Sequence, residues 1–394
     1  MIGFEEASRL LRESVAVLPA EIVPLEAATG RYLAEDLVAR FDAPRTAVSA
    51  MDGYAVRADT LENGVPLNIL GEARPGTPFN GAVGAGEAVR IFTGAAVPVG
   101  ADCVVMQEYA RREGNAVIFE QGHGPARHVR TAGSDFRQGD VLLRRGTRLT
   151  PRAMVAAAAA DQASAQVSIA PRVAIIATGD ELVSPGDAHT TSHAIPESAS
   201  YGVAALCEAM GGSVVLRLRG RDELGPLTDL ASDALAAADL VVVTGGASVG
   251  DHDLARPMFE TLGLELVFAK VAIKPGKPVW LGKVGDKLVL GLPGNPTSAM
   301  VTARLFLQPI AAAMQGGNAA ENVRFLPMPC AAALPAAGSR ETFIRAAATS
   351  EGLIPSQNQE SGAQAPLAQS NWLIRREPHA PATAPGETVS ALLF

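Results

Sequence analysis

Apolar runs alternate with helix-like segments between residues 172 and 310. Several runs are short, continuous and rich in β-branched or leucine side chains, as buried strands are: RVAIIATG, SVVLRLRG, DLVVVTGG and LELVFAKV. The segments between them have the length and composition of helices: PESASYGVAALCEAMGG, LGPLTDLASDALAAA and LARPMFETLG. Such alternation predicts right-handed βαβ units and a parallel, doubly wound sheet.

A further strand, loop and helix follow in KLVLGLPGNPTSAMVTARLFLQPI. Asn295 is placed to be the N-cap of that helix, with Pro296 at its first position. Apolar residues at helical spacing predict another helix over residues 4–17. The alanine-rich segment 154–165 favours a helix by propensity alone.

Glycine and proline interrupt short apolar runs from about residue 43 to 135, which is the pattern of a β-rich domain. After about residue 318 the chain is rich in proline and alanine, with strand-like pieces in ETFIRAA and WLIRRE. The expected fold class is therefore α/β and β multidomain. It combines a doubly wound parallel-sheet domain with β-rich flanking domains and a small C-terminal β domain.

The composition limits the class of protein. The chain has 394 residues, 48% hydrophobic and 19% charged, which is typical of two or three globular domains. Its longest apolar stretch, 154–160, is far shorter than the roughly 20 residues of a membrane span, and the N-terminal MIGFEEASRLLRESV lacks the apolar part of a signal peptide. A net charge of −8 argues against nucleic-acid binding. Three separated cysteines suggest neither a disulfide framework nor a zinc site, so a reducing, cytoplasmic location is expected.

Polar side chains gather where predicted strands end, in ATGDEL (177–182), TGGASVGDHD (244–253) and GLPGNP (291–296), with KPGKP (274–278) nearby. In open α/β sheets, ligands bind outside the carboxyl ends of the strands. Glycines let backbone N–H groups approach an anion, and lysines add positive charge. The carboxylates of the first two segments are hard oxygen ligands that suit Mg²⁺. The combination predicts a phosphate-type anion bound with a divalent metal, although each segment alone is also an ordinary turn former.

The loop after DLVVVTGG also contains a different candidate chemistry. Residues 246–250, GASVG, match the G-x-S-x-G pattern of a serine hydrolase, with Ser248 as nucleophile. Such a serine normally leads directly into a helix, whereas the acidic tripeptide DHD follows here. A partner histidine later in the chain would have to be His252 or His379. A serine hydrolase therefore stays an alternative to the anion site.

Eight stretches of the chain form a recognisable series. They run from MDGYAV (51–56) to GLPGNPTSA (291–299), through GEARPGTPF, IFTGAAVPVGADCVV, VRTAGSDFRQGDVLL, RVAIIATGDELVSPG, VVVTGGASVGDHD and VAIKPGKPVW. Together, and in this order, they resemble the molybdopterin molybdenumtransferases, the family of bacterial MoeA and the gephyrin E domain. The resemblance extends from residue 1 to about 316, with a weaker tail. No single stretch is decisive, but eight in register are highly specific.

The resemblance implies an elongated homodimer whose subunits have four domains. The implied boundaries are residues 1–23 plus 169–316 for a molybdopterin-binding-like α/β domain, 43–135 for a β-rich domain, 24–42 plus 136–168 for a linker and dimerisation domain, and 317–394 for a C-terminal β-barrel-like domain. The implied enzyme is a Mg²⁺-dependent transferase that converts adenylylated molybdopterin and molybdate into molybdenum cofactor and AMP. Expected protein partners are a second copy of the chain, the molybdopterin adenylyltransferase and molybdoenzyme chaperones, with no nucleic acid and no membrane.

Site residues follow from the same resemblance, position by position. Asp52, Glu181 and Asp253 are the expected catalytic residues, in a cleft between subunits. The expected metal ligands are Glu181, Asp222, Asp251 and Asp253. Substrate binding is expected from a larger set: Thr93, Asp135, Gly245, Gly246, Ser248, Lys274, Lys277 and Asn295.

The chain departs from the family pattern in three places. Thr46-Ala47-Val48-Ser49 stands where an aromatic-Asp-Asn-Ser stretch is usual, Pro196-Glu197-Ser198-Ala199 where Tyr-Asp-Ser-Asn is usual, and Ser370-Asn371-Trp372 where Ala-Asn-Gly is usual. These changes remove polar groups that the family places around its pocket, while Glu197 keeps a charge on a longer side chain. The alternative to the full reaction is therefore a divergent paralogue that binds molybdopterin without efficient metal insertion.

Overall fold

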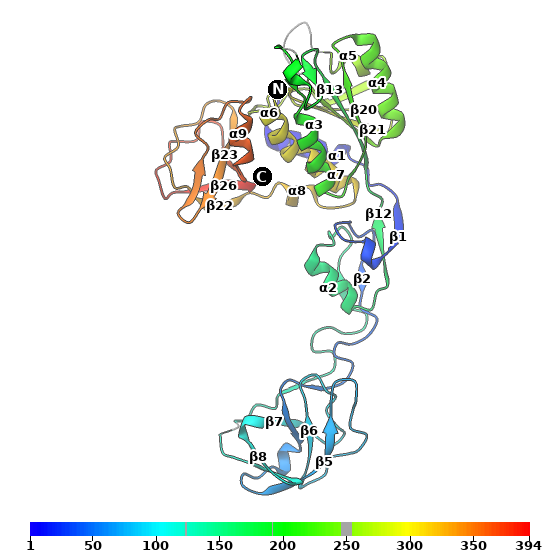
Figure 1. Ribbon diagram of the computed structural model, residues 1–394, viewed down its shortest axis with the longest axis vertical. Coiled ribbons are helices and arrows are strands. Elements are labelled where there is room, and N and C mark those ends of the chain that lie inside the picture. Colours follow the sequence, from blue (N-terminus) through cyan, green and yellow to red (C-terminus); the bar gives the residue numbers. More distant parts are fainter. Residues whose placement is uncertain (123, 191, 246–253) are drawn as a thin grey trace. The chain divides into compact units, whose positions relative to one another are not determined.

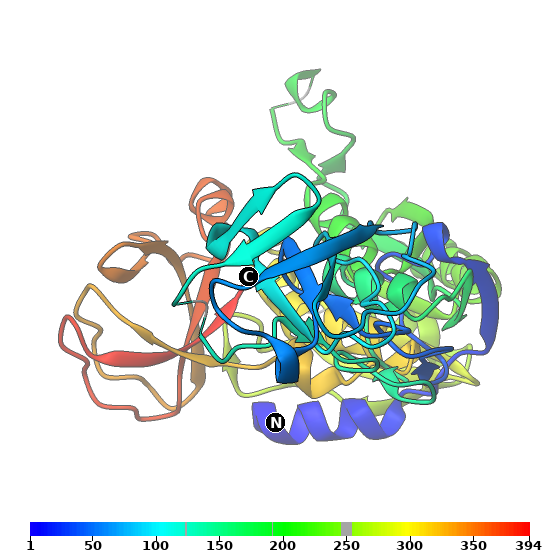
Figure 2. The same ribbon diagram turned by 90° about the horizontal axis from the view of Figure 1, so that it is seen from below.

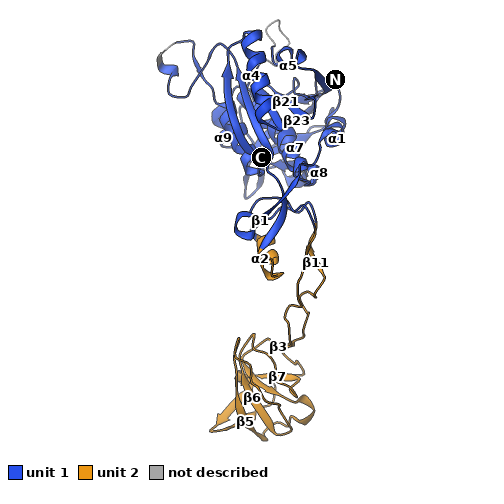
Figure 3. Cartoon of the chain, turned by 90° about the vertical axis from the view of Figure 1, so that its right-hand side faces the viewer, with its two compact units in different colours: residues 1–35, 145–151, 164–394 blue, residues 36–144, 152–163 orange. Residues whose placement is uncertain are grey.

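The computed structural model describes residues 1–122, 124–190, 192–245 and 254–394. The chain divides into two units (Figures 1 and 3). Unit 1 comprises Met1–Glu35, Arg145–Pro151 and Ser164–Phe394, and unit 2 comprises Asp36–Arg144 and Arg152–Ala163. Each unit is therefore assembled from segments that are distant in the sequence.

A six-stranded sheet organises unit 1, in the order β16-β13-β17-β21-β20-β18. Its strands are β13 (Arg172–Thr178), β16 (Ser213–Gly220), β17 (Leu240–Thr244), β18 (Leu264–Phe268), β20 (Trp280–Val284) and β21 (Lys287–Leu292). β13, β16, β17 and β21 are parallel, which confirms the predicted parallel core. β20 is antiparallel to both of its neighbours, β21 and β18, because a tight turn rather than a helical crossover joins β20 to β21. β18 therefore runs in the same direction as the parallel strands.

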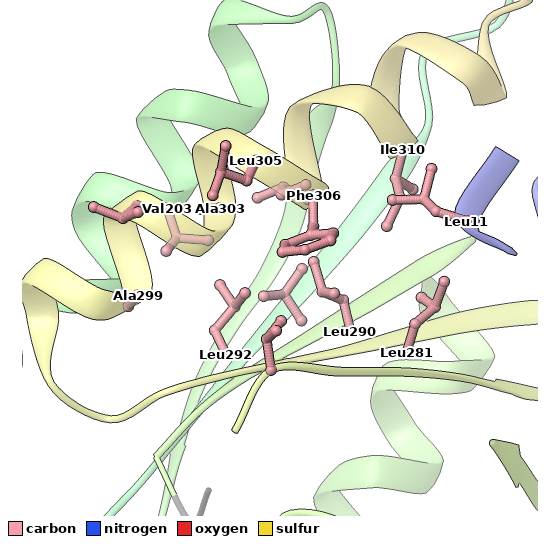
Figure 4. Packing of buried hydrophobic residues seen from close by; sticks show 14 of the residues in the cluster. Leu11, Val203, Leu281, Leu290, Leu292, Ala299, Ala303, Leu305, Phe306 and Ile310 are labelled. Atoms are coloured by element: carbon pink, nitrogen blue, oxygen red, sulfur yellow. The ribbon is translucent and has the colours of Figure 1, made fainter. Parts of the chain in front are cut away.

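Helices cover both faces of this sheet. One face carries α1 (Phe4–Ser14), α3 (Ala199–Ala209), α6 (Pro296–Thr302), the π-helical turn η5 (Ala303–Leu307) and α7 (Gln308–Met314), and the other carries α4 (Leu224–Ala237) and α5 (Pro257–Glu260). Along β13, Val173 and Ile175 pack in the first core, whereas Ala174 and Ile176 pack in the second. Figure 4 shows the first core, where Phe306 lies over the strand that carries Leu290. The strand is buried on both faces, which explains its continuous apolar run.

Two predicted helices are longer in the sequence pattern than in the structure. The helix expected over residues 254–263 is limited to α5, which begins at Pro257. The helix expected over 4–17 ends at Ser14, because Val15 already has an extended backbone (φ −87°, ψ 126°). In both cases apolar spacing continues past the last hydrogen-bonded turn, so periodicity alone overestimates the length.

A second sheet in unit 1 is formed mainly by the C-terminal part of the chain. It contains β19 (Ile273–Lys274), β23 (Glu341–Thr349), β25 (Trp372–Arg376), β26 (Thr388–Leu393) and β22 (Leu326–Pro329), with β24 (Gly352–Pro355) paired to β23. β23 and β25 coincide with the predicted strand pieces ETFIRAA and WLIRRE. The short helices α8 (Ala319–Asn322) and α9 (Gln364–Ala368) lie between its strands in sequence. β19 pairs in parallel with the start of β23. The KPGKP segment (274–278) begins in β19 and leads to β20, so it connects this sheet to the central sheet.

An antiparallel ribbon of β1 (Ala20–Pro24) and β12 (Ser164–Ser168) also belongs to unit 1. The preceding helix α2 spans Pro151–Ala159, so the helix predicted over 154–165 is wrong for its second half. Asp161 adopts a left-handed backbone (φ 61°) that ends the helical path. Pairing with β1 then overrides the helix propensity of the alanine-rich sequence.

Unit 2 is built around a six-stranded sheet in the order β7-β4-β6-β5-β9-β8. Its strands are β4 (Gly53–Val56), β5 (Pro66–Ala73), β6 (Glu87–Ile91), β7 (Cys103–Met106), β8 (Ala110–Glu113) and β9 (Ala116–Phe119). Shorter pairs are β2 (Leu37–Val38) with β11 (Val141–Leu143), and β3 (Val48–Ser49) with β10 (Val129–Arg130). The predicted β-rich character of this region is confirmed.

An excursion of the chain separates β13 from α3 and contains β14 (Leu182–Val183), η4 (Ala188–Thr190) and β15 (Ile195–Pro196), green in Figure 2. β14 and β15 pair in parallel, so the excursion leaves and returns at one edge of the central sheet. Both of its ends thus lie near the carboxyl end of β13. Across the four described ranges, no helix has the length and apolar character that a membrane crossing requires.

Candidate functional site

A pocket of about 790 Å³ lies at the carboxyl edge of the central sheet. The ends of β13 and β17 and the loop after β21 meet there, because these strands are parallel and adjacent. The predicted site residues that line the pocket are Glu181, Asp222, Gly245, Lys277 and Asn295. The structure therefore brings together five predicted residues from five separate segments of the chain.

Gly245 lies where β17 ends and has a φ of +99°, a backbone conformation that favours glycine. A Cβ atom at this position would lie 2.3 Å from the carbonyl oxygen of Thr178 and 2.7 Å from the Thr178 hydroxyl. A Cβ atom on Gly294 would lie 3.1 Å from Cα of Gly245. The backbones of three strand ends thus approach each other closely, and a side chain at Gly245 would push them apart.

The acidic part of the pocket comes from Glu181 and Asp222. The Glu181 carboxylate folds back over the backbone, since a Cβ atom on Gly179 would lie 2.8 Å from its Oε2. The loop that carries Asp222 is held by Asp180, whose Oδ1 accepts a hydrogen bond from the Asp222 N–H at 3.2 Å. Two carboxylates suit Mg²⁺, which is commonly held by one or two carboxylates together with substrate phosphates. Within the part of the chain that the structure describes, no group of three or more His, Cys, Asp or Glu side chains is arranged to hold a metal ion.

Positive charge in the pocket comes from Lys277 and Lys270. Lys277 is exposed, whereas Lys270, which the sequence analysis did not single out, is half-buried. Lys274 lines a neighbouring cavity of about 1540 Å³, to which Lys277 also contributes. Of the two predicted lysines, Lys277 is thus the one shared by both cavities.

Asn295 occupies the N-cap position of α6, with Pro296 next to it as predicted. Its side chain does not cap the helix. Instead, Nδ2 of Asn295 donates to Oγ of Ser361 at 3.0 Å, and the Thr297 N–H donates to the Ser361 carbonyl at 3.2 Å. The amide of Asn295 therefore ties the start of α6 to the C-terminal region at the rim of the pocket.

Glu197, one of the departures from the family pattern, also lines the pocket and is 7% exposed. Its Oε1 accepts a hydrogen bond from the Ser200 N–H at 2.8 Å, and its Oε2 accepts one from the Ser200 hydroxyl. Both carboxylate oxygens are thus engaged at the first turn of α3, where a negative charge is favourable. Glu197 acts as the cap of this helix.

The pocket contains polar residues that the sequence analysis missed, above all Thr178 and Ser198. Thr178 is the first residue of the TGD motif and is 4% exposed. The nearest signal in the sequence was its position as the last residue of a predicted strand, which is where ligand-binding residues of α/β sheets lie.

In unit 2, the structure brings Asp52 and Thr93 together. Oδ1 of Asp52 accepts hydrogen bonds from the backbone N–H and from the hydroxyl of Thr93, both at 2.8 Å. The antiparallel pairing of β4 with β6, in which Gly53 faces Ile91, places the two residues side by side. The Thr93 amide, and after it the hydroxyl, hold the pKa of the Asp52 carboxyl below its ordinary value. Asp135 lies after β10, where its N–H donates to the Ala43 carbonyl at 2.9 Å.

Gly246, Ser248, Asp251 and Asp253 lie outside the described residues. The predicted anion cradle and the alternative serine nucleophile both depend on this segment, so both stay predictions. Gly245 is the described residue at its N-terminal side.

The fold and the pocket define a class: an α/β ligand-binding domain that presents carboxylates and lysines at its carboxyl edge, within a multidomain chain. Residues 2–160 match the MoeA N-terminal region (domain I and II), residues 174–313 a probable molybdopterin binding domain, and residues 327–394 the MoeA C-terminal region (domain IV). The chain is 35% identical to a molybdopterin molybdenumtransferase of Haemophilus influenzae, over 80% of this chain and 78% of the relative. The chain belongs to this family of transferases, and its function lies in molybdenum cofactor biosynthesis.

Other relatives agree with this assignment. A molybdopterin molybdenumtransferase of Staphylococcus aureus is 31% identical, over 100% of this chain and 95% of the relative. A crystal structure of the molybdopterin biosynthesis moeA protein from Pyrococcus horikoshii OT3 is 27% identical, covers 100% of both chains and has a TM-score of 0.86. A molybdenum cofactor biosynthesis protein from Pyrococcus furiosus, 19% identical over 100% of both chains with a TM-score of 0.63, shares the fold.

Proposed function

We propose that the chain catalyses the insertion of molybdate into adenylylated molybdopterin, with release of molybdenum cofactor and AMP. The observation that carries the proposal is the pocket at the carboxyl edge of the sheet, where Lys277 and Lys270 lie with Glu181 and Asp222. Molybdate and the phosphate groups of the substrate are anions that lysines attract. The carboxylates are ligands for the Mg²⁺ ion that commonly accompanies such phosphates.

Individual roles are part of this proposal. Lys274, Lys277 and Asn295 bind anionic groups, and Gly245 with Gly246 and Ser248 provides backbone and hydroxyl contacts. Glu181 and Asp222, with Asp251 and Asp253, hold Mg²⁺, which when bound neutralises charge on the phosphate oxygens. Glu181 and Asp253 act as catalytic residues.

We also propose a homodimeric assembly. In a homodimer of four-domain subunits, residues 43–135 of one subunit would complete the pocket of its partner, and Asp52, Thr93 and Asp135 would enter there. The fixed, ionised carboxylate of Asp52 supports such a role, because it is only half-buried and already oriented. We propose a cytoplasmic enzyme that receives its substrate from the molybdopterin adenylyltransferase and passes its product to molybdoenzyme chaperones.

The test is AMP release from adenylylated molybdopterin in the presence of molybdate and Mg²⁺. Glu181→Ala is expected to reduce the rate of AMP release by at least about a hundredfold. Without this Mg²⁺ ligand, the negative charge on the reacting phosphate is less well neutralised. Binding of the pterin should remain measurable by fluorescence titration. Glu208→Ala, which removes an exposed carboxylate of α3 outside the pocket, should release AMP at the normal rate. Normal turnover by Glu181→Ala would remove this residue from the mechanism.

A second function, binding of molybdopterin without efficient metal insertion, is favoured by one observation. Both oxygens of Glu197 are engaged at the start of α3, at a position where the family usually has aspartate. Wild-type protein that binds adenylylated molybdopterin but releases no AMP, even with molybdate and Mg²⁺, would establish this function and overturn the enzymatic one.

A further inference from the structure

Two residues that line the 790 Å³ pocket, Thr178 and Ser198, each carry a buried hydroxyl oxygen (Oγ1 and Oγ) that has no hydrogen-bond partner among the described residues. Buried hydroxyls are almost always hydrogen-bonded in folded proteins, and each exception calls for a physical reason. These two come from different elements, the end of β13 and the start of α3, yet they line the same pocket.

Thr178 is held rigidly at its position. It is the last residue of β13, pairs with Gly220 of β16 and is 4% exposed. Its hydroxyl lies against Gly245, as the 2.7 Å distance to a Cβ atom built there shows. Burial at the strand end keeps this hydroxyl from water, and a buried hydroxyl without a partner lowers the stability of the free protein.

Ser198 is unpaired for a different reason. It occupies the N-cap position of α3, where a serine side chain normally accepts a hydrogen bond from an N–H group of the first turn. Glu197 already accepts the hydrogen bond of the Ser200 N–H, and Ser198 makes no side-chain cap. Glu197, one residue earlier in the chain, thus caps the helix, and the hydroxyl of Ser198, a residue that lines the pocket, has no partner among the described residues.

We infer that Thr178 and Ser198 form a hydroxyl subsite of this pocket, which binds polar oxygen or nitrogen atoms of the ligand. Hydroxyl groups both donate and accept hydrogen bonds and carry no charge. They complement Lys277, Glu181 and Asp222, which act on charged groups. The inference rests on the proposed function, because it takes adenylylated molybdopterin as the ligand; the hydroxyls contact either its phosphate oxygens or its pterin ring.

A ligand-binding hydroxyl without an internal partner has a specific signature: its removal stabilises the free protein and weakens binding. Thr178→Val keeps the shape of the side chain and removes the hydroxyl, so the midpoint of thermal unfolding should rise by about 2–4 °C without ligand. The Kd for adenylylated molybdopterin should increase about five- to tenfold. Ser198→Ala should weaken binding similarly, whereas Thr178→Ser and Ser198→Thr keep the hydroxyl and should bind nearly as the wild type does.

Thr302→Val is the matched control. Thr302 is also fully buried, but its hydroxyl donates to the Ser298 carbonyl at 2.7 Å and lies 3.1 Å from the Ala299 carbonyl. This variant should gain no stability and should bind the ligand normally. A fall in the unfolding midpoint of Thr178→Val would show that its hydroxyl has an internal partner and would overturn the inference for Thr178.

Binding measurements with two compounds, AMP and adenylylated molybdopterin, distinguish a contact with phosphate from a contact with the pterin. Weaker binding of both AMP and adenylylated molybdopterin to Thr178→Val assigns the hydroxyls to phosphate, and weaker binding of the pterin compound alone assigns them to the pterin. Unchanged binding of both compounds to Thr178→Val and Ser198→Ala overturns the subsite while leaving the proposed function intact. Wild-type protein that binds neither compound overturns the proposed function and, with it, the subsite.

Discussion

The pocket of unit 1 and the Asp52–Thr93 pair of unit 2 both present polar groups where strands end, but they treat hydrogen bonds in opposite ways. In unit 2, Asp52 accepts two hydrogen bonds from Thr93, so its carboxylate is fixed and held ionised. In unit 1, Thr178 and Ser198 keep buried hydroxyls without partners among the described residues. Paired polar groups stabilise a loop, whereas unpaired ones reduce stability until a ligand pairs with them. The comparison separates a site that presents a fixed charge from a site that is shaped around an incoming molecule.

The largest effect is expected where the unit 1 pocket depends on the backbone. Gly245→Ala places a Cβ atom 2.3 Å from the Thr178 carbonyl at a φ of +99°, so it should reduce the free energy of unfolding by about 2–4 kcal/mol. Binding of adenylylated molybdopterin should fall as well, because the strand ends move apart. Urea unfolding and fluorescence titration measure the two effects.

Gly225→Ala is the control for that substitution. Gly225 lies in α4, and a Cβ atom built there meets nothing within 4 Å. Alanine should raise the stability by about 0.5 kcal/mol through its helix propensity and leave binding unchanged. Equal stability losses in the two variants would contradict the view that the pocket requires glycine specifically at Gly245.

A smaller, pH-dependent effect is expected in unit 2. The pKa of Asp52 is lowered in the folded protein, first by the Thr93 amide, so ionisation of Asp52 stabilises the fold above the unfolded pKa of about 3.9. This stabilisation is lost as the pH falls through the lower, folded pKa. Asp52→Asn should therefore be less stable than the wild type at neutral pH, and the difference should shrink on acidification below about pH 4.

Urea unfolding of both proteins between neutral and acidic pH measures this convergence. A stability difference that stays constant across the whole range would show that Asp52 contributes through packing rather than through its charge.

The smallest effect should come from the Thr93 hydroxyl alone. Thr93→Val removes one of the two hydrogen bonds to Asp52, so the pKa of Asp52 should rise towards its ordinary value but stay below it, because the backbone amide remains. Carboxyl-carbon NMR of Asp52 over a pH titration measures the shift. Thr93→Ser retains a hydroxyl and should keep the wild-type pKa. An unchanged pKa in Thr93→Val would mean that the amide acts alone.

Much of the fold could be predicted from the sequence, because strands buried on both faces give continuous apolar runs such as that of β13. The order of the strands is harder to predict. LELVFAKV forms β18, which runs in the same direction as the parallel strands, but the antiparallel strand β20, which the sequence pattern did not indicate, lies between β18 and β21. The pairing of Ser164–Ser168 with β1 also escaped the analysis, since the alanine-rich segment has a helical propensity and only the distant strand opposes it.

The candidate site could likewise be predicted only in part from the sequence. Glu181, Gly245 and Lys277 could be predicted, because glycine and charge at a strand end are visible along the chain. Thr178 and Ser198 could not, because a hydroxyl is notable only when its surroundings offer no partner, and that is a property of the folded structure. The capping role of Glu197, which leaves Ser198 unpaired, is likewise read from hydrogen bonds rather than from residue types.

The N-terminal helix has a consequence for how the protein is made. Phe4 packs edge-on against Phe306, Phe325 and Phe343, and Glu5 forms an ion pair with Arg375 at 2.6 Å. During synthesis at about 5–20 residues per second, roughly 300 residues separate Phe4 from its first aromatic partner, so α1 waits on the order of 15–60 s. Throughout that time its apolar face has no native partner from this cluster. We therefore expect a chaperone to bind the apolar face of α1 on the nascent chain until these aromatic partners have been synthesised.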